Sequence, residues 1–378
     1  MKSPLSLRTF ISQSREAGSR RWYKVNSFIL ISCLISFTYA NAMTSNIKSD
    51  EHIIFFRTDA AFNPTTQQWS VPIHGWVFEN EHSWFRKNAF AKVIELKYNL
   101  SRDDDSSVFF DRRTGWLISD NERNKSIVIN IANKIIQLPK SEANGHFNGV
   151  ALLSRDDVSL AQKNGLIEYR AKLKKHDSRE FIGQSALISP HGQSIISDID
   201  DTVKVSGVTD TKTLINYTFF QDFLPAPGMA KLYQSWDEQS VHFHFVSSSP
   251  WQLYPDLLDF LKRQNFPWAS LYLKSIRFKD SSFFDLFKEG TVTKPIQIES
   301  IMARYPERSF ILIGDSGEQD PEAYTQIYLK YPSRIDRIYI RNVTNETMDN
   351  SRFSSLSKRL PAGTMALFED PETIYATQ

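Results

Sequence analysis

Between Ile53 and Leu187 the chain shows short apolar runs or an alternation of apolar and polar residues, with a period of about two. This pattern is typical of half-buried strands, and many short strands favour an antiparallel sandwich or barrel. We therefore predict an N-terminal antiparallel β-sandwich over residues 43–190. The expected strands include Ile53–Phe56, Trp69–Phe78, Ala91–Tyr98, Ser126–Ile131 and Leu166–Leu173, with turns at Ser101–Ser107 and Ser119–Asn124.

From Ser194 onward, strand patterns alternate with helical ones. Alternation of this kind predicts a Rossmann-like parallel sheet with helices on both faces, and ligands bind such sheets beyond the carboxyl ends of the strands. We assign this second domain to residues 191–378. Helices are expected at Pro227–Trp236, Leu253–Gln264, Ile296–Tyr305 and Pro321–Tyr331, and later strands at Ile335–Arg341 and Thr364–Phe368.

The first strand of this domain ends in two spaced carboxylates. In Ser194–Thr202, a short apolar run leads into Asp198 and Asp200, and Thr202 follows. Phosphoryl transfer through a covalent enzyme intermediate requires two such groups. One carboxylate attacks phosphorus, and the other protonates the leaving oxygen and later activates water. Asp198 is the candidate nucleophile and Asp200 the candidate acid and base.

Three further motifs are expected beside this pair. A second apolar strand leads into Asp315 and Asp320, which can bind Mg²⁺ through carboxylate oxygens. A third strand ends at Ser247, and Lys294 opens a helix. Ser247 and Lys294 can stabilise the phosphoryl oxygens, on which charge spreads in the transition state. The alternatives are Ser248 or Ser249 for Ser247, Lys274 for Lys294, and Glu318 for Asp320.

This order of motifs resembles that of the haloacid dehalogenase superfamily. The amino-acid sequences of the motifs resemble those of the catalytic domain of actin-patch type phosphatidate phosphatases. The resemblance runs from about Ser194 to about Thr344 and rests on Asp198–Lys204, Ser247–Pro255, Lys294–Pro295 and Gly314–Glu322. It implies Mg²⁺-dependent hydrolysis of phosphatidate, or a related lipid phosphate, to diacylglycerol and phosphate.

The same resemblance implies roles for individual residues. Asp198 forms an aspartyl-phosphate, and the metal is held by Asp198, the backbone carbonyl of Asp200, Asp315 and Asp320. Lys204 either steers the substrate phosphate or is a solvated lysine. The intervals 203–226 and 249–294 are too short for a large cap domain, and an open crevice suits a large or membrane-embedded phosphoester.

Two other features carry weaker expectations. The segment Leu271–Phe287 mixes aromatic and cationic residues, which fits peripheral contact with an anionic membrane surface and equally an ordinary strand, loop and helix. His242 and His244 alternate along one strand, but the sequence offers no third metal ligand nearby. We therefore expect them to be a packed or hydrogen-bonded pair.

Composition favours a folded protein that does not bind nucleic acid. Apolar residues make up 41% of the 378 residues and charged residues 23%, which is typical of a globular protein. The formal charge of +2 is dominated by residues 1–24, which hold six basic residues and one acidic residue. That segment carries +5, which leaves −3 for the rest of the chain and argues against a nucleic-acid partner.

Residues 1–42 show a secretion signal. A basic segment precedes the apolar run 25–39, and Ala40–Ala42 provides a small-residue cleavage site. We expect export to the periplasm or the exterior. Alternatives are an uncleaved membrane anchor, twin-arginine export through Arg20 and Arg21, and lipoprotein processing at Cys33. Cleavage after Ala42 would remove the only cysteine and with it any disulfide or thiolate chemistry.

Two alternatives to a lipid phosphate phosphatase remain. One is the same chemistry on a soluble phosphomonoester or a phosphoprotein. The other is an exported envelope-binding protein whose β domain binds the ligand, with the C-terminal domain as a scaffold. The sequence implies no particular oligomeric state.

Overall fold

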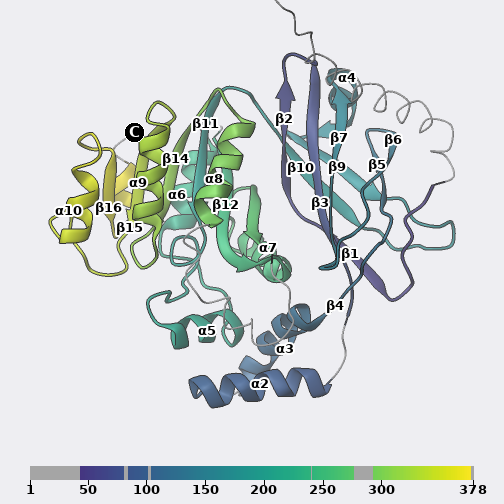
Figure 1. The fold of residues 1–378 in the computed structure, drawn as a ribbon, viewed down its shortest axis with the longest axis horizontal. Coiled ribbons are helices and arrows are strands. Elements are labelled where there is room, and N and C mark those ends of the chain that lie inside the picture. Colours follow the sequence, from purple (N-terminus) through teal and green to yellow (C-terminus); the bar gives the residue numbers. More distant parts are fainter. Residues whose placement is uncertain (1–42, 81–83, 101–103, 240, 276–292, 376–378) are drawn as a thin grey trace, which may run out of the picture. The chain divides into compact units, whose positions relative to one another are not determined.

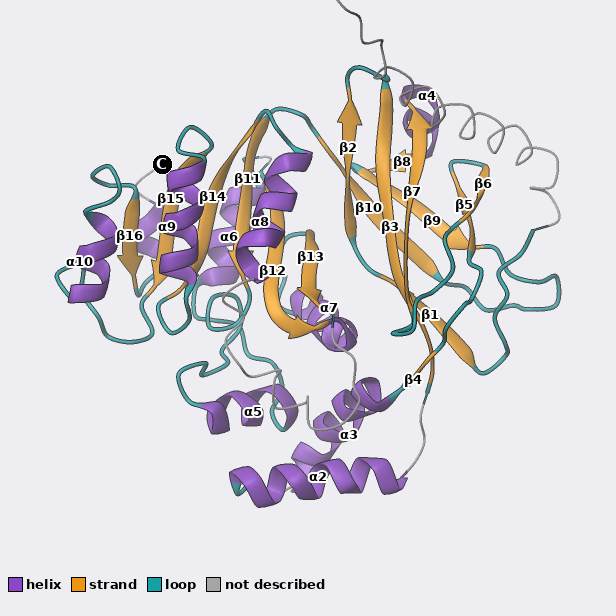
Figure 2. Ribbon diagram, viewed as in Figure 1, coloured by secondary structure: helices purple, strands orange, loops and turns teal. Residues whose placement is uncertain are grey.

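The computed structural model describes residues 43–80, 84–100, 104–239, 241–275 and 293–375 (Figure 1). Residues Thr44–Gln378 form one compact unit. It contains two sheets, which we call sheet A and sheet B (Figure 2). Sheet A ends at Ile188, and sheet B begins at Gly192.

Sheet A is antiparallel except for one parallel pair, β2 with β10. Its strand order is β1-β3-β2-β10-β9-β5-β6, with β4 and β7 also paired to β3 and β8 paired to β9. The bounds are β1 Glu51–Phe55, β2 Thr58–Asn63, β3 Gln68–Glu79, β4 Asp120–Asn121, β5 Val128–Ile131, β6 Lys134–Gln137, β7 His146–Ser154, β8 Gln162–Lys163, β9 Leu166–Ala171 and β10 Ile182–Ile188.

The core of sheet A is built from alternating strand residues. Ile53 and Phe55 of β1 and Ile73 of β3 pack in one buried cluster with Ile129 of β5 and Ile167 of β9. This period-two burial is the pattern from which the strands were predicted, and the predicted β-sandwich is confirmed. A short helix, α4 (Arg155–Ala161), follows β7.

The prediction of a strand at Ala91–Tyr98 is wrong. These residues lie in helix α2 (Trp84–Tyr98), and helix α3 (Asp104–Ile118) follows where a turn was expected at Ser101–Ser107. Ala91 and Ile94 are buried, whereas Leu96 is 77% exposed. Burial three positions apart is helical, because strand alternation would bury Ile94 and Leu96 together.

Sheet B is entirely parallel and has the order β13-β12-β11-β14-β15-β16, which is that of a doubly wound Rossmann-like sheet. The strands are β11 Gly192–Asp198, β12 His242–Pro250, β13 Ala269–Lys274, β14 Arg308–Asp315, β15 Ile335–Arg341 and β16 Met365–Phe368. The helices are α5 Thr211–Phe219, α6 Met229–Asp237, the 3₁₀ helix η1 Trp251–Leu253, α7 Tyr254–Arg263, α8 Thr293–Arg304, α9 Asp320–Lys330, α10 Ser351–Ser357 and α11 Glu372–Tyr375.

Helices cover both faces of sheet B. In β11, Ile195 packs into one buried cluster and Ile196 into the other, on opposite faces of the sheet. This double burial explains why the strands read as continuous apolar runs. The predicted parallel domain is confirmed, and its described part holds no large cap; α5 and α10 were not predicted.

The two sheets share buried residues. Phe56 and Trp76 from the sheet A region belong to the same apolar cluster as Ile195 of β11. The division into a 43–190 domain and a 191–378 domain therefore remains a prediction. The predicted secretion signal at 1–42 lies outside the described residues, and within the described part no helix is both long and apolar enough to cross a membrane.

Candidate active site at the carboxyl edge of sheet B

The predicted site residues meet at one edge of sheet B. Asp198 is the last residue of β11, Asp315 is the last residue of β14, and Ser247 lies toward the carboxyl end of β12. These three strands are neighbours in the sheet. Lys294 is in the first turn of α8, and Asp320 begins α9. The expected convergence on one crevice therefore follows from the topology.

Four carboxylates lie close together, and one lysine contacts three of them. Asp198, Asp315, Glu318 and Asp320 each place an oxygen within 4.8 Å of the others. The ammonium of Lys294 lies 2.8 Å from Oδ1 of Asp198 and 3.1 Å from Oε2 of Glu318, and it also contacts Oδ1 of Asp320. Lys294 is thus the lysine of the site, because Lys274, the alternative, makes no hydrogen bond to these groups in the described structure.

The site carries more negative charge than its lysine can balance. Burial raises the pKa of Asp198 well above its usual value, and the carboxylates of Asp320, Glu318 and Asp315 act in the same direction against Lys294. Burial likewise raises the pKa of Asp315. For Lys294, burial acts to lower the pKa, but the carboxylates outweigh it and raise the value. A divalent cation would relieve this excess of negative charge.

The donor set fits Mg²⁺. Oδ2 of Asp198 and Oδ2 of Asp315 are both buried, and neither has a hydrogen-bond partner among the described residues. The other oxygen of Asp315 accepts hydrogen bonds from the backbone amides of Gly317 at 2.6 Å and Glu318 at 3.0 Å, which fix the carboxylate. Hard oxygen ligands of this kind are what Mg²⁺ prefers. Glu318 lies close to Asp320, so both carboxylates are available as ligands for the metal.

The side chain of Asp200 lies outside the acidic group and faces hydrogen-bond donors. Its Oδ1 accepts from the ammonium of Lys204 at 2.6 Å and the hydroxyl of Ser206 at 2.8 Å. Its Oδ2 accepts from Ser247 at 3.0 Å and Ser249 at 3.3 Å. Burial acts to raise the pKa of Asp200, but the Lys204 charge and these hydrogen bonds outweigh it and hold the value at about 2.

The contacts of Asp200 bear on what was expected for Lys204, for Asp200 itself and for Ser247. Lys204 is 2% exposed, so the alternative of a solvated lysine is wrong. These donors occupy the Asp200 side chain, and a metal contact through its backbone carbonyl stays a prediction. Ser247 and Ser249 both donate to Asp200, and both therefore remain candidates for the phosphate contact. Thr202 is fully buried, and its hydroxyl has no partner in the part of the chain that the structure describes.

Asp201 was not predicted from the sequence. This residue has a φ of 53°, in the left-handed region. Its carboxylate accepts hydrogen bonds from the amides of Ser206 (2.7 Å), Gly207 (3.0 Å) and Val208 (2.7 Å). Asp201 therefore holds the loop that presents Lys204 and Ser206 to Asp200. An aspartate followed by Ser-Gly five positions later is a turn signal that could have indicated this role.

His242 and His244 have a carboxylate neighbour that the sequence did not reveal. Nδ1 of His244 lies 2.7 Å from Oδ2 of Asp59, on β2 of sheet A. The three residues place potential ligand atoms within 4.8 Å of one another. Asp59 also accepts hydrogen bonds from Ser270, Tyr272 and Arg304, the last at 2.7 Å. With a cation already on this carboxylate, Asp59 and His244 form a hydrogen-bonded pair that joins the two sheets, and the ring of His242 packs against that of His244 at 4.8 Å.

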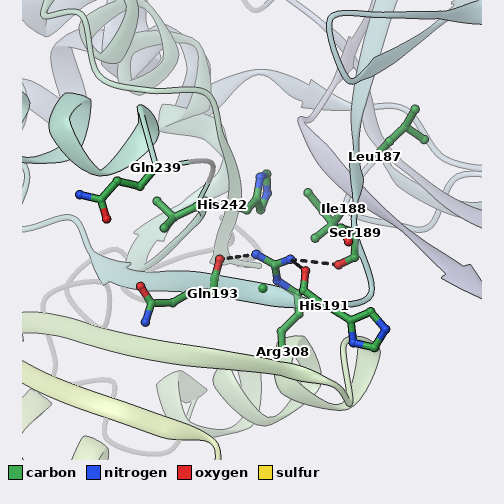
Figure 3. Close-up of a pocket in the computed structure, with 10 residues that line it drawn as sticks. Leu187, Ile188, Ser189, His191, Gln193, Gln239, His242 and Arg308 are labelled. Carbon is green, nitrogen blue, oxygen red and sulfur yellow. Dashed lines mark hydrogen bonds between the residues drawn. The ribbon is translucent and has the colours of Figure 1, made fainter. Parts of the chain in front are cut away.

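A pocket of about 640 Å³ lies at the opposite edge of sheet B (Figure 3). Its lining includes Gln193, His242 and Arg308, which begin or nearly begin β11, β12 and β14. The dashed lines in Figure 3 mark hydrogen bonds from the guanidinium of Arg308 to backbone carbonyls beside the pocket. Arg308 donates hydrogen bonds to the carbonyls of Ser189 at 3.0 Å and His191 at 2.6 Å. Its guanidinium therefore stabilises the loop between the two sheets. The pocket is separate from the carboxylates.

The parallel sheet carries the acidic group at its carboxyl edge, where the motifs predicted it. Residues 193–342 match the family described as "Phosphatidate phosphatase APP1, catalytic domain". The resemblance inferred from the motifs is confirmed over this segment.

Two yeast proteins are similar to the same part of the chain. Phosphatidate phosphatase APP1 of Saccharomyces cerevisiae is 37% identical over 167 residues, which cover 43% of this chain and 28% of that protein. An uncharacterized protein of Schizosaccharomyces pombe is 29% identical over 193 residues, covering 49% and 31%. The chain thus spans less than a third of the length of these relatives.

Solved structures that align with this chain do so weakly. A heptose bisphosphate phosphatase of B. bronchiseptica, complexed with magnesium and phosphate, has a TM-score of 0.30 and 14% identity, covering 49% of this chain and 99% of that one. An apo phosphoserine phosphatase has a TM-score of 0.31 and 8% identity, covering 48% and 97%. The assignment of the fold rests instead on the strand order and the match at 193–342.

Proposed function

We propose that this protein is a phosphoric monoester hydrolase that requires Mg²⁺, works through an aspartyl-phosphate and acts on phosphatidate or a related lipid phosphate. The observation that carries the proposal is the pair of buried carboxylate oxygens, Oδ2 of Asp198 and Oδ2 of Asp315, beside the Lys294 ammonium. A buried carboxylate beside a cluster of carboxylates that can bind a metal is suited to act as the nucleophile in phosphoryl transfer.

The residues divide the chemistry between them. Asp198 attacks phosphorus, and the bond between phosphorus and the leaving oxygen breaks while Asp200 gives that oxygen a proton. Asp200 then takes a proton from water, the water attacks the phosphoryl group on Asp198, and phosphate leaves. Lys294, 2.8 Å from Asp198, stabilises charge on the phosphoryl oxygens. Mg²⁺, held by Asp198, Asp315 and Asp320, would supply further positive charge at that group.

The contacts of Asp200 impose a condition on the first step. With a pKa of about 2 it is ionised, which suits the removal of a proton from water. Protonation for the first step requires the Lys204 ammonium to shift toward another anion. The substrate phosphate is such an anion, so Lys204 has a role in binding it.

The lipid substrate rests on the match of residues 193–342 to the phosphatidate phosphatase catalytic domain. Among the described residues the intervals 203–226 and 249–294 hold no large inserted domain, in keeping with a site for a bulky phosphoester. Export through residues 1–42 is proposed from the sequence pattern alone.

The test is phosphate release from phosphatidate in mixed micelles, with Mg²⁺ or with EDTA. Full-length protein is compared with Asp198→Asn and with the control Asp336→Asn. Asp336 is an exposed aspartate of β15 that bonds Gln193 at the opposite edge of the sheet. We expect Mg²⁺-dependent release by the wild type and the control, and a loss of at least about a thousandfold in Asp198→Asn.

A soluble aryl phosphate separates the alternatives. Turnover of the aryl phosphate alone, abolished in Asp198→Asn, would retain the mechanism and reject the lipid substrate. Turnover of neither compound by a folded wild type would reject the enzyme and favour a binding protein.

A further inference from the structure

Helix α2 presents an apolar stripe on its exposed face. Ala89, Val93 and Leu96 are spaced four and three residues apart, so they lie along one side of the helix. Val93 is 46% exposed and Leu96 77%, whereas Ala91 and Ile94 on the opposite side are buried. Exposed large apolar residues are common when single, but two of them beside an exposed alanine on one helix face form a larger apolar patch, which indicates a contact surface.

Lysines border this stripe on both sides. At 3.6 residues per turn, Lys92 lies roughly 40° beyond Leu96, and Lys97 roughly 40° beyond Val93 on the other side. Both lysines are exposed. Lysine side chains can cover apolar surface with their stems while the ammonium stays in a polar layer. An apolar centre with cationic borders is complementary to an anionic phospholipid surface.

Helices α2 and α3 pack at the edge of sheet B that carries the carboxylates. They share a buried cluster with α5, the helix that follows the Asp198 motif; its members are Ala91, Ile94, Phe110, Leu117, Ile215, Phe219 and Phe220. Figure 2 shows α2, α3 and α5 on the side toward which β13 and β16 point. Arg113 of α3 donates to the carbonyls of Thr218 at 2.9 Å and Gln221 at 2.7 Å.

Arg113 also connects this helical layer to the active site. Its guanidinium lies 3.7 Å from the ring centre of Phe223, and the ammonium of Lys204 lies 5.0 Å from the centre of the same ring. Lys204 in turn bonds Asp200. Two more exposed apolar residues flank the site: Leu224 is 51% exposed, and Ile296, two positions after Lys294, is 62% exposed.

We propose that α2 lays the face formed by Ala89, Val93 and Leu96, which we call the α2 face, on an anionic phospholipid surface. The surface would bring the carboxyl edge of sheet B to phosphate headgroups in the bilayer. The benefit to catalysis rests on the proposed lipid phosphatase function, but the docking itself requires no turnover.

A fluorescence experiment tests the docking locally. Full-length protein with Cys33→Ser and Leu96→Cys is labelled at position 96 with a polarity-sensitive dye. It is mixed with phosphatidylcholine vesicles, with or without phosphatidylglycerol and without any phosphatidate. We expect a blue shift that depends on phosphatidylglycerol and protection of the dye from an aqueous quencher. Every labelled variant has the same residues 1–42, including Cys33→Ser. Differences in fluorescence between variants therefore arise at the labelled positions.

The matched control is the label at Leu152→Cys in the same Cys33→Ser background. Leu152 is 55% exposed on β7 of sheet A, beside Val150 at 54%, so it is also apolar and exposed. No shift is expected there. Lys92→Glu with Lys97→Glu, in the position-96 reporter, should weaken the interaction with anionic vesicles by at least about tenfold.

Three results would overturn the docking proposal. They are no shift at position 96, an equal shift at position 152, or a shift that grows with protein concentration in the absence of vesicles, which would indicate self-association. Phosphatidate hydrolysis, measured separately, distinguishes the two proposals. Docking without hydrolysis would support membrane binding by the α2 face and reject phosphatidate as the substrate. Hydrolysis without docking would support the substrate and reject membrane binding by the α2 face.

Discussion

The ammonium of Lys294 lies 2.8 Å from Oδ1 of Asp198 and contacts three members of the group of four carboxylates. A buried charge whose partner is removed is costly, because the remaining charges lose their compensation without returning to water. The lysine therefore has two tasks: it offsets the repulsion between the carboxylates, and it stabilises the phosphoryl group in the proposed reaction.

Replacing this lysine should affect catalysis and metal dependence together. We expect Lys294→Met to lower kcat by about a hundredfold or more, the usual loss for a transition-state charge contact. Without the ammonium, the carboxylates repel one another more strongly, so Mg²⁺ should raise the Tm of the variant more than that of the wild type. Phosphate release and thermal unfolding with Mg²⁺ or EDTA measure both effects. Lys274→Met is the control, and an equal loss of activity in it would contradict the assignment of Lys294.

Gly314 allows Asp320 to approach the end of β14. A Cβ at position 314 would lie 2.2 Å from Oδ2 of Asp320 and 2.7 Å from its Cγ, which is too close for either group to remain in place. We expect Gly314→Ala to displace Asp320 and raise the Mg²⁺ concentration needed for half-maximal activity by about tenfold or more, since ligand geometry sets the affinity of such a site. A metal titration of phosphate release measures this change.

A second glycine provides the control for that substitution. In Gly115→Ala, on helix α3, the new Cβ would meet only the end of the Lys87 side chain, at 3.7 Å. Alanine is preferred over glycine within a helix by about 1 kcal/mol, so this variant should be slightly more stable and equally active. An unchanged metal requirement in Gly314→Ala would show that the Gly314–Asp320 contact is not needed for metal binding.

The convergence of the site residues could be predicted because it depends on general geometry. Asp198 and Asp315 each end an apolar run, and parallel strands present their carboxyl ends at one edge. What the sequence could not show is the direction of each side chain. Asp200 is two positions from Asp198, yet its carboxylate bonds Lys204 and Ser247 and is not part of the group of four carboxylates.

Two failures have different physical causes. In Ala91–Tyr98 the apolar residues fit either a strand or a helix over so short a window, and packing of Ile94 against α5 decides the outcome. The contact between Asp59 and His244 joins residues far apart in the chain and on different sheets. No local pattern reports such a contact, because it depends on how the sheets pack.

Asp201 should be required for both stability and activity. Replacing it with alanine removes the acceptor for three backbone amides. It also leaves a residue at a φ of 53°, in the left-handed region, without the side-chain hydrogen bonds that aspartate makes there. We expect Asp201→Ala to lower the free energy of unfolding by about 1–3 kcal/mol and to lower kcat, because Ser206 and Lys204 lose their position beside Asp200. Denaturant unfolding and phosphate release measure the two effects.

Asp210 supplies a matched control for Asp201. It caps the amino end of α5 by accepting a hydrogen bond from the amide of Thr213 at 2.8 Å. Asp210→Ala should cost about 1 kcal/mol of stability and leave kcat unchanged. An equal loss of kcat in both variants would mean that activity follows stability alone and that Asp201 has no special role.

His146 should make the protein less stable in mild acid. Its Nδ1 lies 3.0 Å from Nε2 of His74, in a cluster with Phe56 and Trp251, and it is 3% exposed. Burial lowers the pKa of His146 to about 4, below the value of about 6.5 for an unfolded chain. Below pH 6.5 the unfolded state takes up a proton that the folded state refuses. The stabilising contribution is therefore complete above about pH 6.5 and falls as the pH drops toward 4, by up to about 1.4 kcal/mol per pH unit.

The variant His146→Gln should show a shallower loss of stability over this range, because the group responsible for the difference in proton uptake is absent. Urea unfolding at intervals between pH 7 and pH 4 measures the slope. His191→Gln is the control, since the His191 side chain is 76% exposed and its replacement should leave the slope as in the wild type. If His146→Gln and the wild type lose stability in parallel, the buried histidine pair does not govern the acid response, and other groups must account for it.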